Sequence, residues 1–183
     1  KKPTGTLVLD ALTPGKRLYM FSTGTGFAPF ASLVRDPETY EKFEDVIVTH
    51  TCRQNGELQY STKLVEDLVN DPLVGEMVHG KLKLFTSCTQ EDSPRMGRPT
   101  DLIRSGELFK QLGLPPLDPS TDRAMICGSM PMTLEMKELM QEAGLTEGSN
   151  AAPAEFVIRG TKHEEIGERH NFLRARRLRT RSA

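Results

Sequence analysis

The sequence has no tryptophan, only three cysteines and no long hydrophobic run among its 183 residues. Cys52, Cys88 and Cys127 are odd in number, lie far apart in the chain and lack metal-ligand spacing, which argues against a disulfide framework and against a zinc site. No apolar stretch approaches the ~18 residues needed to cross a membrane, and no segment resembles a signal peptide. These absences predict a cytoplasmic protein without a metal site or membrane contact.

The charge is distributed unevenly along a chain that is long enough for one domain with a buried core. The net charge is −1, but from Arg159 onward eight Lys/Arg face three Glu, a balance of +5, which leaves 16 basic and 22 acidic groups, or −6, in the first 158 residues. A basic tail of this kind is typical of a solvated, disordered or nucleic-acid-binding end. We expect residues 159–183 to be dispensable for folding, and a nucleic-acid-binding function would rest on them alone.

The beginning of the chain suggests a piece of a longer protein, because Lys1 is not preceded by a methionine and a buried strand follows soon after. We expect residues 1–16 to be the end of an upstream domain and a linker, with an edge strand at residues 7–9.

The most informative stretch is residues 17–30, R-L-Y-M-F-S-T-G-T-G-F-A-P-F. An apolar run at residues 18–21 suits a buried strand, and glycines and hydroxyl residues then break it. A helix is expected next, since apolar residues recur at i, i+3, i+4 and i+7: Phe27, Phe30, Ala31 and Val34. A strand, a glycine turn and a helix start in this order favour an anion site above the turn, which consists of Thr23, Gly24, Thr25 and Gly26. Because Pro29 replaces the third glycine of the dinucleotide fingerprint G-x-G-x-x-G, a plain strand-to-helix turn remains an alternative.

Four further apolar segments, at residues 46–48, 81–86, 124–127 and 154–158, read as strands that alternate with amphipathic helices. This alternation predicts a parallel sheet with ligands over the carboxyl ends of its strands. The residues at those ends, beyond the glycine turn, are Arg53, Thr89, Gln90, Cys127, Gly128, Ser129 and Met130. The methionines of the last helix are expected to fill the core.

The side chains at these strand ends suit nucleotide binding better than hydrolysis, because they include no His/Asp pair and no carboxylate pair. Arg53 stands where an NAD-type site would place an acidic residue, which favours a phosphorylated ligand. His50 is expected to be a hydrogen-bonded histidine near the core. Cys127 stays ambiguous at this point, since a buried cysteine at a strand end is usually inert packing.

Four motifs, T-G-T-G-F-A-P-F, G-R-P-T-D-L-I-R-S-G-E-L-F, G-L-P-P and D-R-A-M-I-C-G-S-M-P-M, together resemble the pyridine-nucleotide half of bacterial ferredoxin/flavodoxin–NADP reductases. The resemblance covers residues 1–158. That family has an FAD-binding β-barrel followed by an NADP-binding α/β domain. The resemblance implies a Rossmann-like NADP-binding module at residues 17–158, an open five-stranded parallel sheet of order 3-2-1-4-5 with helices on both faces.

The resemblance also implies roles for single residues. Thr25 would reach the flavin, while the glycine turn faces the dinucleotide. Arg53, the Thr89–Gln90 loop and Arg98 would hold the phosphate-bearing adenosine end. Cys127 would be the catalytic residue beside the nicotinamide, where hydride passes between NADP(H) and FAD, and single electrons would be exchanged with ferredoxin or flavodoxin.

Three departures from the family are visible in the sequence. The barrel and its flavin-binding motif are absent, so FAD would be held mostly by a missing upstream domain and this fragment would be inactive alone. Gln90 stands where the family often has arginine, and Arg159-Gly160-Thr161 replaces the expected E-x-A-F-V ending. The alternatives are a reductase component of an oxygenase and a non-catalytic nucleotide-binding fragment.

Overall fold

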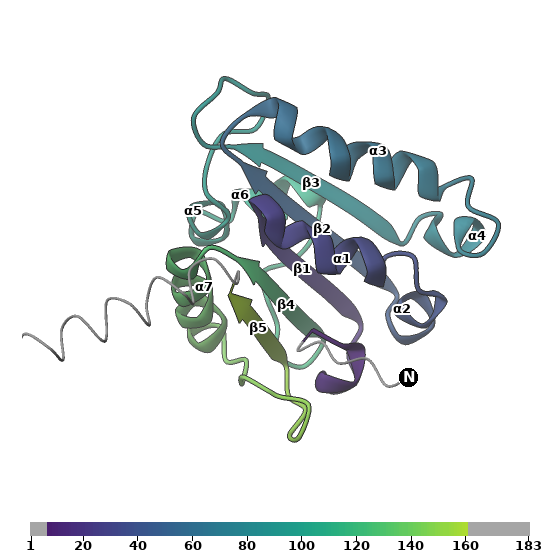
Figure 1. The fold of residues 1–183 in the computed structure, drawn as a ribbon. Coiled ribbons are helices and arrows are strands. Elements are labelled where there is room, and N and C mark those ends of the chain that lie inside the picture. The colour runs from purple at the N-terminus through teal and green to yellow at the C-terminus, as the bar shows by residue number, and fades with distance from the viewer. Residues whose placement is uncertain (1–6, 161–183) are drawn as a thin grey trace, which may run out of the picture.

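A computed structural model describes residues 7–160, which form one open, fully parallel sheet (Figure 1). Its strand order is β3-β2-β1-β4-β5, which confirms the predicted fold class. The strands are β1 (Arg17–Thr23), β2 (Asp45–Cys52), β3 (Leu82–Cys88), β4 (Asp122–Gly128) and β5 (Phe156–Gly160). The first residues of the expected barrel exit, 1–6, and most of the basic tail, 161–183, lie outside the described residues.

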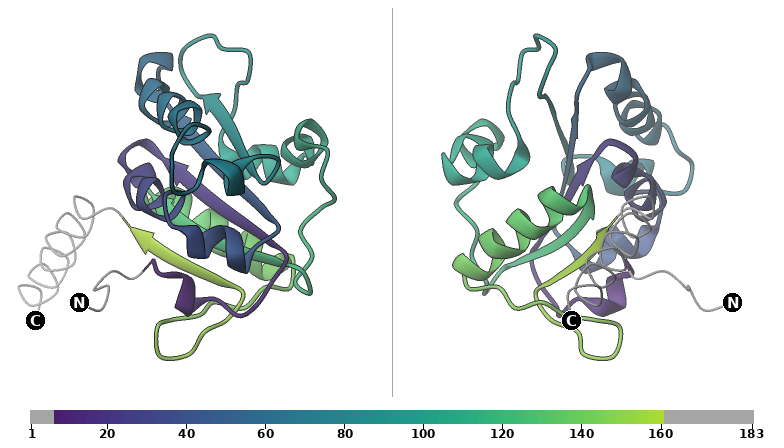
Figure 2. Two further views of the ribbon diagram at one scale, coloured as in Figure 1. Left: turned by 90° about the vertical axis from the view of Figure 1, so that its right-hand side faces the viewer. Right: turned by 60° about the vertical axis from the view of Figure 1, so that its left-hand side comes forward.

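Helices cover both faces of the sheet, as predicted (Figures 1 and 2). On one face lie α1 (Ala28–Leu33), α2 (Pro37–Lys42), α3 (Gln59–Leu68) and α4 (Gly75–Val78); on the other lie α5 (Pro99–Arg104), α6 (Glu107–Leu112) and α7 (Met130–Glu142). Short 3-10 turns span Leu9–Ala11, Gly24–Phe27 and Asn55–Leu58. None of the helices in the described part is long and apolar enough to cross a membrane.

The core follows the two-residue period of the strands. In β1, Leu18 and Met20 face one helical layer, while Tyr19 and Phe21 face the other, and all four are fully buried. Both faces of the central strands are therefore covered, which explains their nearly continuous apolar sequence. Met132, Met136 and Met140 of α7 pack in the second layer, so the prediction that they fill the core is confirmed.

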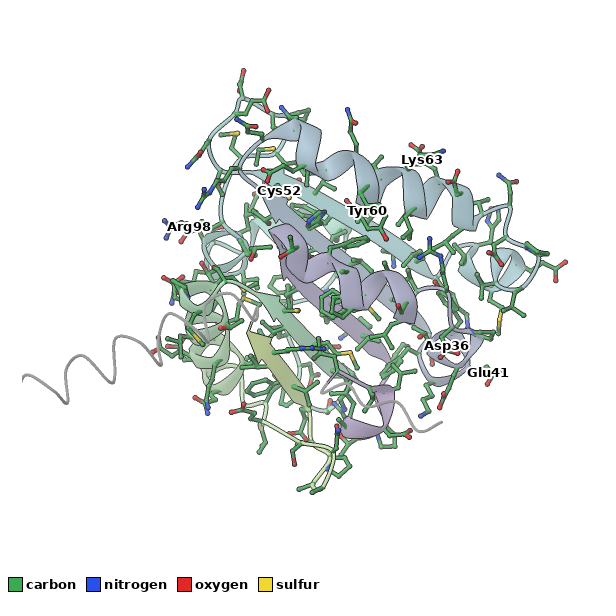
Figure 3. All side chains as sticks on the ribbon, in the orientation of Figure 1. Asp36, Glu41, Cys52, Tyr60, Lys63 and Arg98 are labelled. Carbon is green, nitrogen blue, oxygen red and sulfur yellow. The ribbon has the colours of Figure 1, made fainter. Side chains whose placement is uncertain are left out.

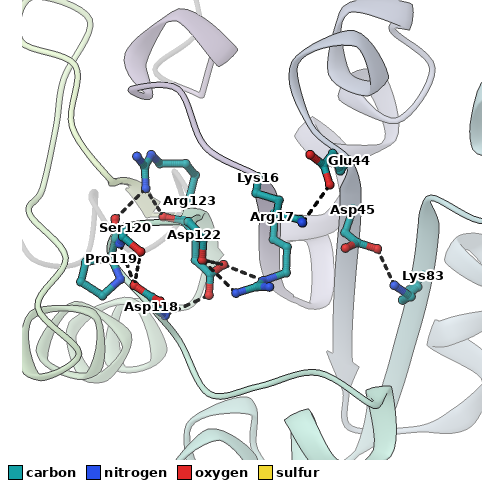
Figure 4. A network of polar contacts seen from close by, with 11 residues as sticks. Lys16, Arg17, Glu44, Asp45, Lys83, Asp118, Pro119, Ser120, Asp122 and Arg123 are labelled. Carbon is teal, nitrogen blue, oxygen red and sulfur yellow. Dashed lines mark hydrogen bonds and ion pairs between the residues drawn. The ribbon is translucent and has the colours of Figure 1, made fainter.

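A polar network fixes the amino-terminal ends of the strands, opposite the predicted site (Figure 4). Arg17 Nε donates to Asp122 Oδ1 over 2.7 Å, and this carboxylate is fully buried. The buried Arg123 guanidinium donates to the carbonyl oxygens of Thr13 and Pro119 at 3.0 and 2.9 Å. These bonds attach the linker before β1 to the start of β4.

Three elements differ from the prediction. No strand forms at residues 7–9; the chain instead makes the 3-10 turn Leu9–Ala11, with Leu7 and Leu9 buried against the core. The strand expected at 154–158 begins and ends two residues later, because Arg159 and Gly160 pair in register with Cys127 and Gly128. The helix expected directly after the glycine turn also starts later, since Gly24–Phe27 is a 3-10 turn.

Candidate functional site

The glycine turn after β1 packs directly on the end of β4. Gly24 has a left-handed φ of +50°, which glycine adopts at little cost. Gly26 has no room for a side chain, because a Cβ there would overlap the carbonyl group of Cys127. A Cβ at Gly128 would overlap Thr23 Oγ1, and the backbone N–H of Ser129 donates to the same hydroxyl over 3.2 Å. Glycine at 26 and 128 thus permits the close approach of the two strand ends.

The ends of β2 and β3 form the neighbouring wall. The backbone N–H groups of Thr89 and Gln90 donate to the carbonyl oxygens of Cys52 and Arg53 over 3.0 and 3.2 Å. Glu57 Oε2 accepts the backbone N–H groups of Arg53 and Gln54, each at 3.0 Å. The Glu57 carboxylate therefore binds backbone N–H groups and not the Arg53 side chain. The Arg53 guanidinium has no ion-pair partner among the described residues.

A cavity of about 610 Å³ opens over these strand ends, a size typical of ligand pockets. Eight of the predicted site residues line it: Thr23, Gly24, Thr25, Arg53, Thr89, Gln90, Arg98 and Ser129. In Figure 3, Cys52, the last residue of β2, and Arg98 lie at the same edge of the sheet, where the strands have their carboxyl ends. The sequence therefore predicted correctly that these separate segments meet.

The cavity carries cationic groups that the described part of the chain leaves unpaired. Arg53 and Arg98 are both exposed, and neither side chain makes a hydrogen bond or an ion pair within residues 7–160. Two carboxylates also lie on the wall: Glu57, which accepts the backbone N–H groups described above, and Glu135 of α7, which is half-buried and has no partner among the described residues. The side chain of Gln90 is exposed, so its amide is available beside the two arginines.

Four predicted residues do not line the cavity: Gly26, Cys127, Gly128 and Met130. The two glycines shape the turn, as described above. Cys127 is only 4% exposed and belongs to the core on the α1 side of the sheet. Burial raises the pKa of the Cys127 thiol, and the nearby positive charge of Arg159 opposes this shift. Met130 is the first residue of α7 and is half-buried.

His50 confirms its predicted place as a hydrogen-bonded histidine near the core. Its side chain is 2% exposed, and its ring nitrogens lie 2.8 Å from Ser61 Oγ and 2.9 Å from the Gly24 carbonyl oxygen. Burial lowers the pKa of His50, so its ring is neutral at pH 7.

Sequence reasoning assigned no role to the other half of the lining, which consists of Thr51, Cys52, Glu57, Pro99, Thr100, Pro131, Met132 and Glu135. Several of these are direct neighbours of predicted residues, so the strand-end rule could have included them. Glu135 lies in the second turn of α7, and the packing of α5 against α7 brings it to the cavity.

Cys52 and Cys88, far apart in sequence, are register partners on β2 and β3, and both are free thiols.

Sequence comparison identifies close relatives over most of the chain. A flavodoxin/ferredoxin–NADP reductase of Rhodobacter capsulatus is 54% identical over 157 residues, which is 86% of this chain and 58% of the relative. A ferredoxin–NADP reductase of Azotobacter vinelandii is 52% identical over 159 residues, 86% of this chain and 62% of the relative. The chain is thus related in sequence to the ferredoxin/flavodoxin–NADP reductase family. It spans about three-fifths of the length of these relatives. No family model matches the chain.

Solved structures agree with this family assignment at the level of the fold. A ferredoxin–NADP⁺ reductase from Neisseria gonorrhoeae, solved with bound FAD and NADP, superposes with a TM-score of 0.73 at 24% identity, covering 86% of this chain and 61% of that one. A flavohemoglobin from Malassezia yamatoensis superposes with a TM-score of 0.57 at 20% identity, over 85% and 35% of the two chains. At these identities the likeness shows a shared fold.

Proposed function

We propose that this chain supplies the NADP-binding part of an oxidoreductase that transfers hydride between NADPH and FAD and exchanges single electrons with ferredoxin or flavodoxin. The observation that carries the proposal is the pair of unpartnered arginines, Arg53 and Arg98, in a cavity over the strand ends of a Rossmann-like sheet. An anionic dinucleotide would give both guanidinium groups the partners that the described protein residues do not give them.

The adenosine end of NADP fits the wall formed by the β2 and β3 ends. The 2′-phosphate carries roughly −1.5 to −2 charge and needs cationic donors. We assign it to Arg98, which immediately precedes α5, and place Arg53 nearer the ribose and pyrophosphate. The Gln90 amide adds a neutral hydrogen bond where many relatives would have a second arginine, so the preference for NADP over NAD should persist but be weaker than a two-arginine clamp would give.

The nicotinamide end would lie over the glycine turn and the end of β4. When bound, NADPH supplies the hydride, and FAD converts the electron pair into single-electron transfers. The residues of this chain position the reactants: Thr25 is exposed on the turn and available to a flavin, and the backbone of Cys127 packs against Gly26 of the same turn. The family resemblance puts Cys127 beside the nicotinamide, but its side chain is buried and does not line the cavity. Cys127 would therefore act by supporting the turn beneath the nicotinamide.

The proposal assigns residues 1–16 to the end of an FAD-binding barrel and a linker, residues 17–158 to the NADP-binding domain and residues 159–183 to an atypical basic tail. In this division FAD is held mostly outside the chain, and the protein acts in the cytoplasm. The linker bonds at Thr13 and Pro14 support a fixed entry into β1.

The 2′-phosphate assignment is tested by titrating NADP and NAD against the wild type, Arg98→Ala and Arg104→Ala. Arg104 is the matched control, since it is an exposed arginine at the end of α5, the helix that Arg98 precedes, but does not line the cavity. A charge-assisted hydrogen bond is worth about 1.5–3 kcal/mol, so Arg98→Ala should weaken NADP binding about 10- to 100-fold and leave NAD nearly unchanged. Isothermal calorimetry gives both dissociation constants.

The control should bind both coenzymes like the wild type. Equal losses for NADP and NAD in Arg98→Ala would show that Arg98 supports the fold or the pyrophosphate. A wild type that binds neither coenzyme would contradict the proposed function as a whole.

A further inference from the structure

A buried histidine connects the glycine turn to helix α3. His50 Nε2 lies 2.9 Å from the Gly24 carbonyl oxygen, and His50 Nδ1 lies 2.8 Å from Ser61 Oγ. The imidazole also stacks on Phe27, the last residue of the turn, with ring centroids 4.9 Å apart and planes inclined by 24°. His50, Ser61 and Phe27 are each at most 2% exposed, so water does not compete for these contacts.

The hydrogen-bonding groups around His50 determine which ring nitrogen carries the proton. A neutral imidazole donates from one nitrogen and accepts at the other. The Gly24 carbonyl oxygen only accepts, so Nε2 must carry the proton if the 2.9 Å contact is a hydrogen bond. Nδ1 must then accept, and the Ser61 hydroxyl is the donor within reach. The Leu58 carbonyl oxygen also lies 2.9 Å from Ser61 Oγ. It stays paired when Ser61 donates to His50, because the Thr62 hydroxyl donates to it over 3.1 Å.

The opposite tautomer is disfavoured by the same contacts. With the proton on Nδ1, the Cys52 thiol, 3.2 Å away, could donate to Nε2. The Gly24 carbonyl oxygen would then face the lone pair of Nε2 at 2.9 Å, which is repulsive. The single Cys52 thiol proton could satisfy only one of these two acceptors. A doubly protonated ring would satisfy both partners but would place a charge in a site where burial lowers the pKa of His50.

We propose that Ser61 and His50 act as a positioning pair for the coenzyme-binding turn, with Ser61 Oγ–H donating to Nδ1 and Nε2–H donating to the Gly24 carbonyl. Because a trans peptide directs its C=O and N–H to opposite sides, holding the Gly24 carbonyl inward turns the Thr25 N–H away from His50. The pair thereby stabilises the left-handed Gly24 and the conformation in which Thr23, Gly24 and Thr25 line the cavity. This inference rests on the proposed function for the role of the cavity.

The tautomer is measured directly by two-bond ¹H–¹⁵N correlation spectra of the histidine rings in the wild-type chain. His50→Gln identifies which signals belong to His50. We expect the Nε2-protonated form, with Nδ1 as the acceptor. A proton on Nδ1, or on both nitrogens at pH 7, would overturn the proposal whether or not coenzyme binds.

The effect on binding is measured with Ser61→Ala, and Thr62→Ala is the matched control. Both hydroxyl oxygens lie within hydrogen-bond distance of the Leu58 carbonyl oxygen, but only Ser61 Oγ also reaches His50. Losing the hydrogen bond that fixes the His50 ring should weaken NADP and NAD binding equally, by about 3- to 10-fold, while Thr62→Ala stays within about 2-fold of the wild type.

A conservative replacement separates positioning from packing. His50→Gln keeps an N–H donor near the position of Nε2, so it should bind NADP more tightly than His50→Leu, by at least about 3-fold. Equal affinities for these two variants, or for Ser61→Ala and Thr62→Ala, would overturn the positioning role. A wild type that binds no coenzyme would instead overturn the proposed function, and the tautomer would still be measurable.

Discussion

At the scale of single residues, the hydroxyl of Thr100 in the cavity wall is an unpaired group. Thr100 is 1% exposed, and its Oγ1 has no hydrogen-bond partner among the described residues. Thr133 is equally buried in the first turn of α7, but its hydroxyl donates to the Met130 carbonyl over 2.9 Å. A buried hydroxyl without a partner costs about 1–3 kcal/mol, whereas a satisfied one is nearly neutral or stabilising.

We therefore expect Thr100→Val to raise the free energy of unfolding by about 1 kcal/mol and Thr133→Val to lower it by a similar amount. Both replacements keep the side-chain shape and remove only the hydroxyl. Urea unfolding followed by circular dichroism measures the difference. A loss of stability in Thr100→Val would mean that this hydroxyl is paired in solution.

Residue type and strand-end position, together with the family resemblance for Arg98, were enough to predict half of the cavity lining from sequence, including Arg53 and the glycine turn. They were not enough for Glu135, because its place depends on how α7 packs against α5. The role of His50 toward Gly24 was also not predictable, since a near-core histidine can find its partners in many places. Contacts between residues distant in sequence depend on the register and packing of the elements, which periodicity does not define.

At the scale of the elements, the turn after β1 depends on glycine at position 26 more than on any feature of helix α1. Gly26 has an ordinary φ, and the constraint on it is space, since the end of β4 occupies the volume that a Cβ would need. Gly56 has an ordinary φ as well, in the 3-10 turn Asn55–Leu58, but a Cβ added there would meet nothing within 4 Å.

Gly26→Ala should lower the free energy of unfolding by about 1–3 kcal/mol or more, because neither backbone can move without breaking the strand pairing. Gly56→Ala should be neutral or stabilise by about 0.4–1 kcal/mol, because alanine restricts the unfolded chain. Chemical denaturation of the two variants makes the comparison. Equal stabilities would show that the turn does not pack on β4 as described.

The hydrophobic pattern identified all five strands. The central strands leave an apolar run because both of their faces are buried, and β3, at the edge of the sheet, shows alternating polar and apolar residues. It was wrong at residues 7–9, where a similar apolar run packs against the core as a 3-10 turn without joining the sheet. It also ended β5 too early, because Arg159 and Gly160 are recruited by backbone pairing with β4 and not by their side chains.

At the scale of the whole molecule, the chain presents one exposed hydroxyl, Thr25, to a flavin in the proposed arrangement. A single contact of this kind is worth about 0.5–1.5 kcal/mol, which is far too little to retain a cofactor during purification. We expect the chain to remain colourless after incubation with FAD and gel filtration, as judged by flavin absorbance. Stoichiometric flavin in the protein peak would contradict the assignment of FAD to a separate domain.

The central claim is that NADP binds in the cavity over the carboxyl ends of the strands, and backbone amide chemical shifts during an NADP titration test it most directly. The account predicts saturable shifts at the cavity residues Gly24, Thr25, Arg53, Gln90, Arg98 and Ser129. The amides of Arg17 and Asp122, at the opposite end of the strands, should not move. Shifts confined to the second hollow, beside Gln59, Lys63 and Ser93, or no saturable shift at any amide, would contradict the account.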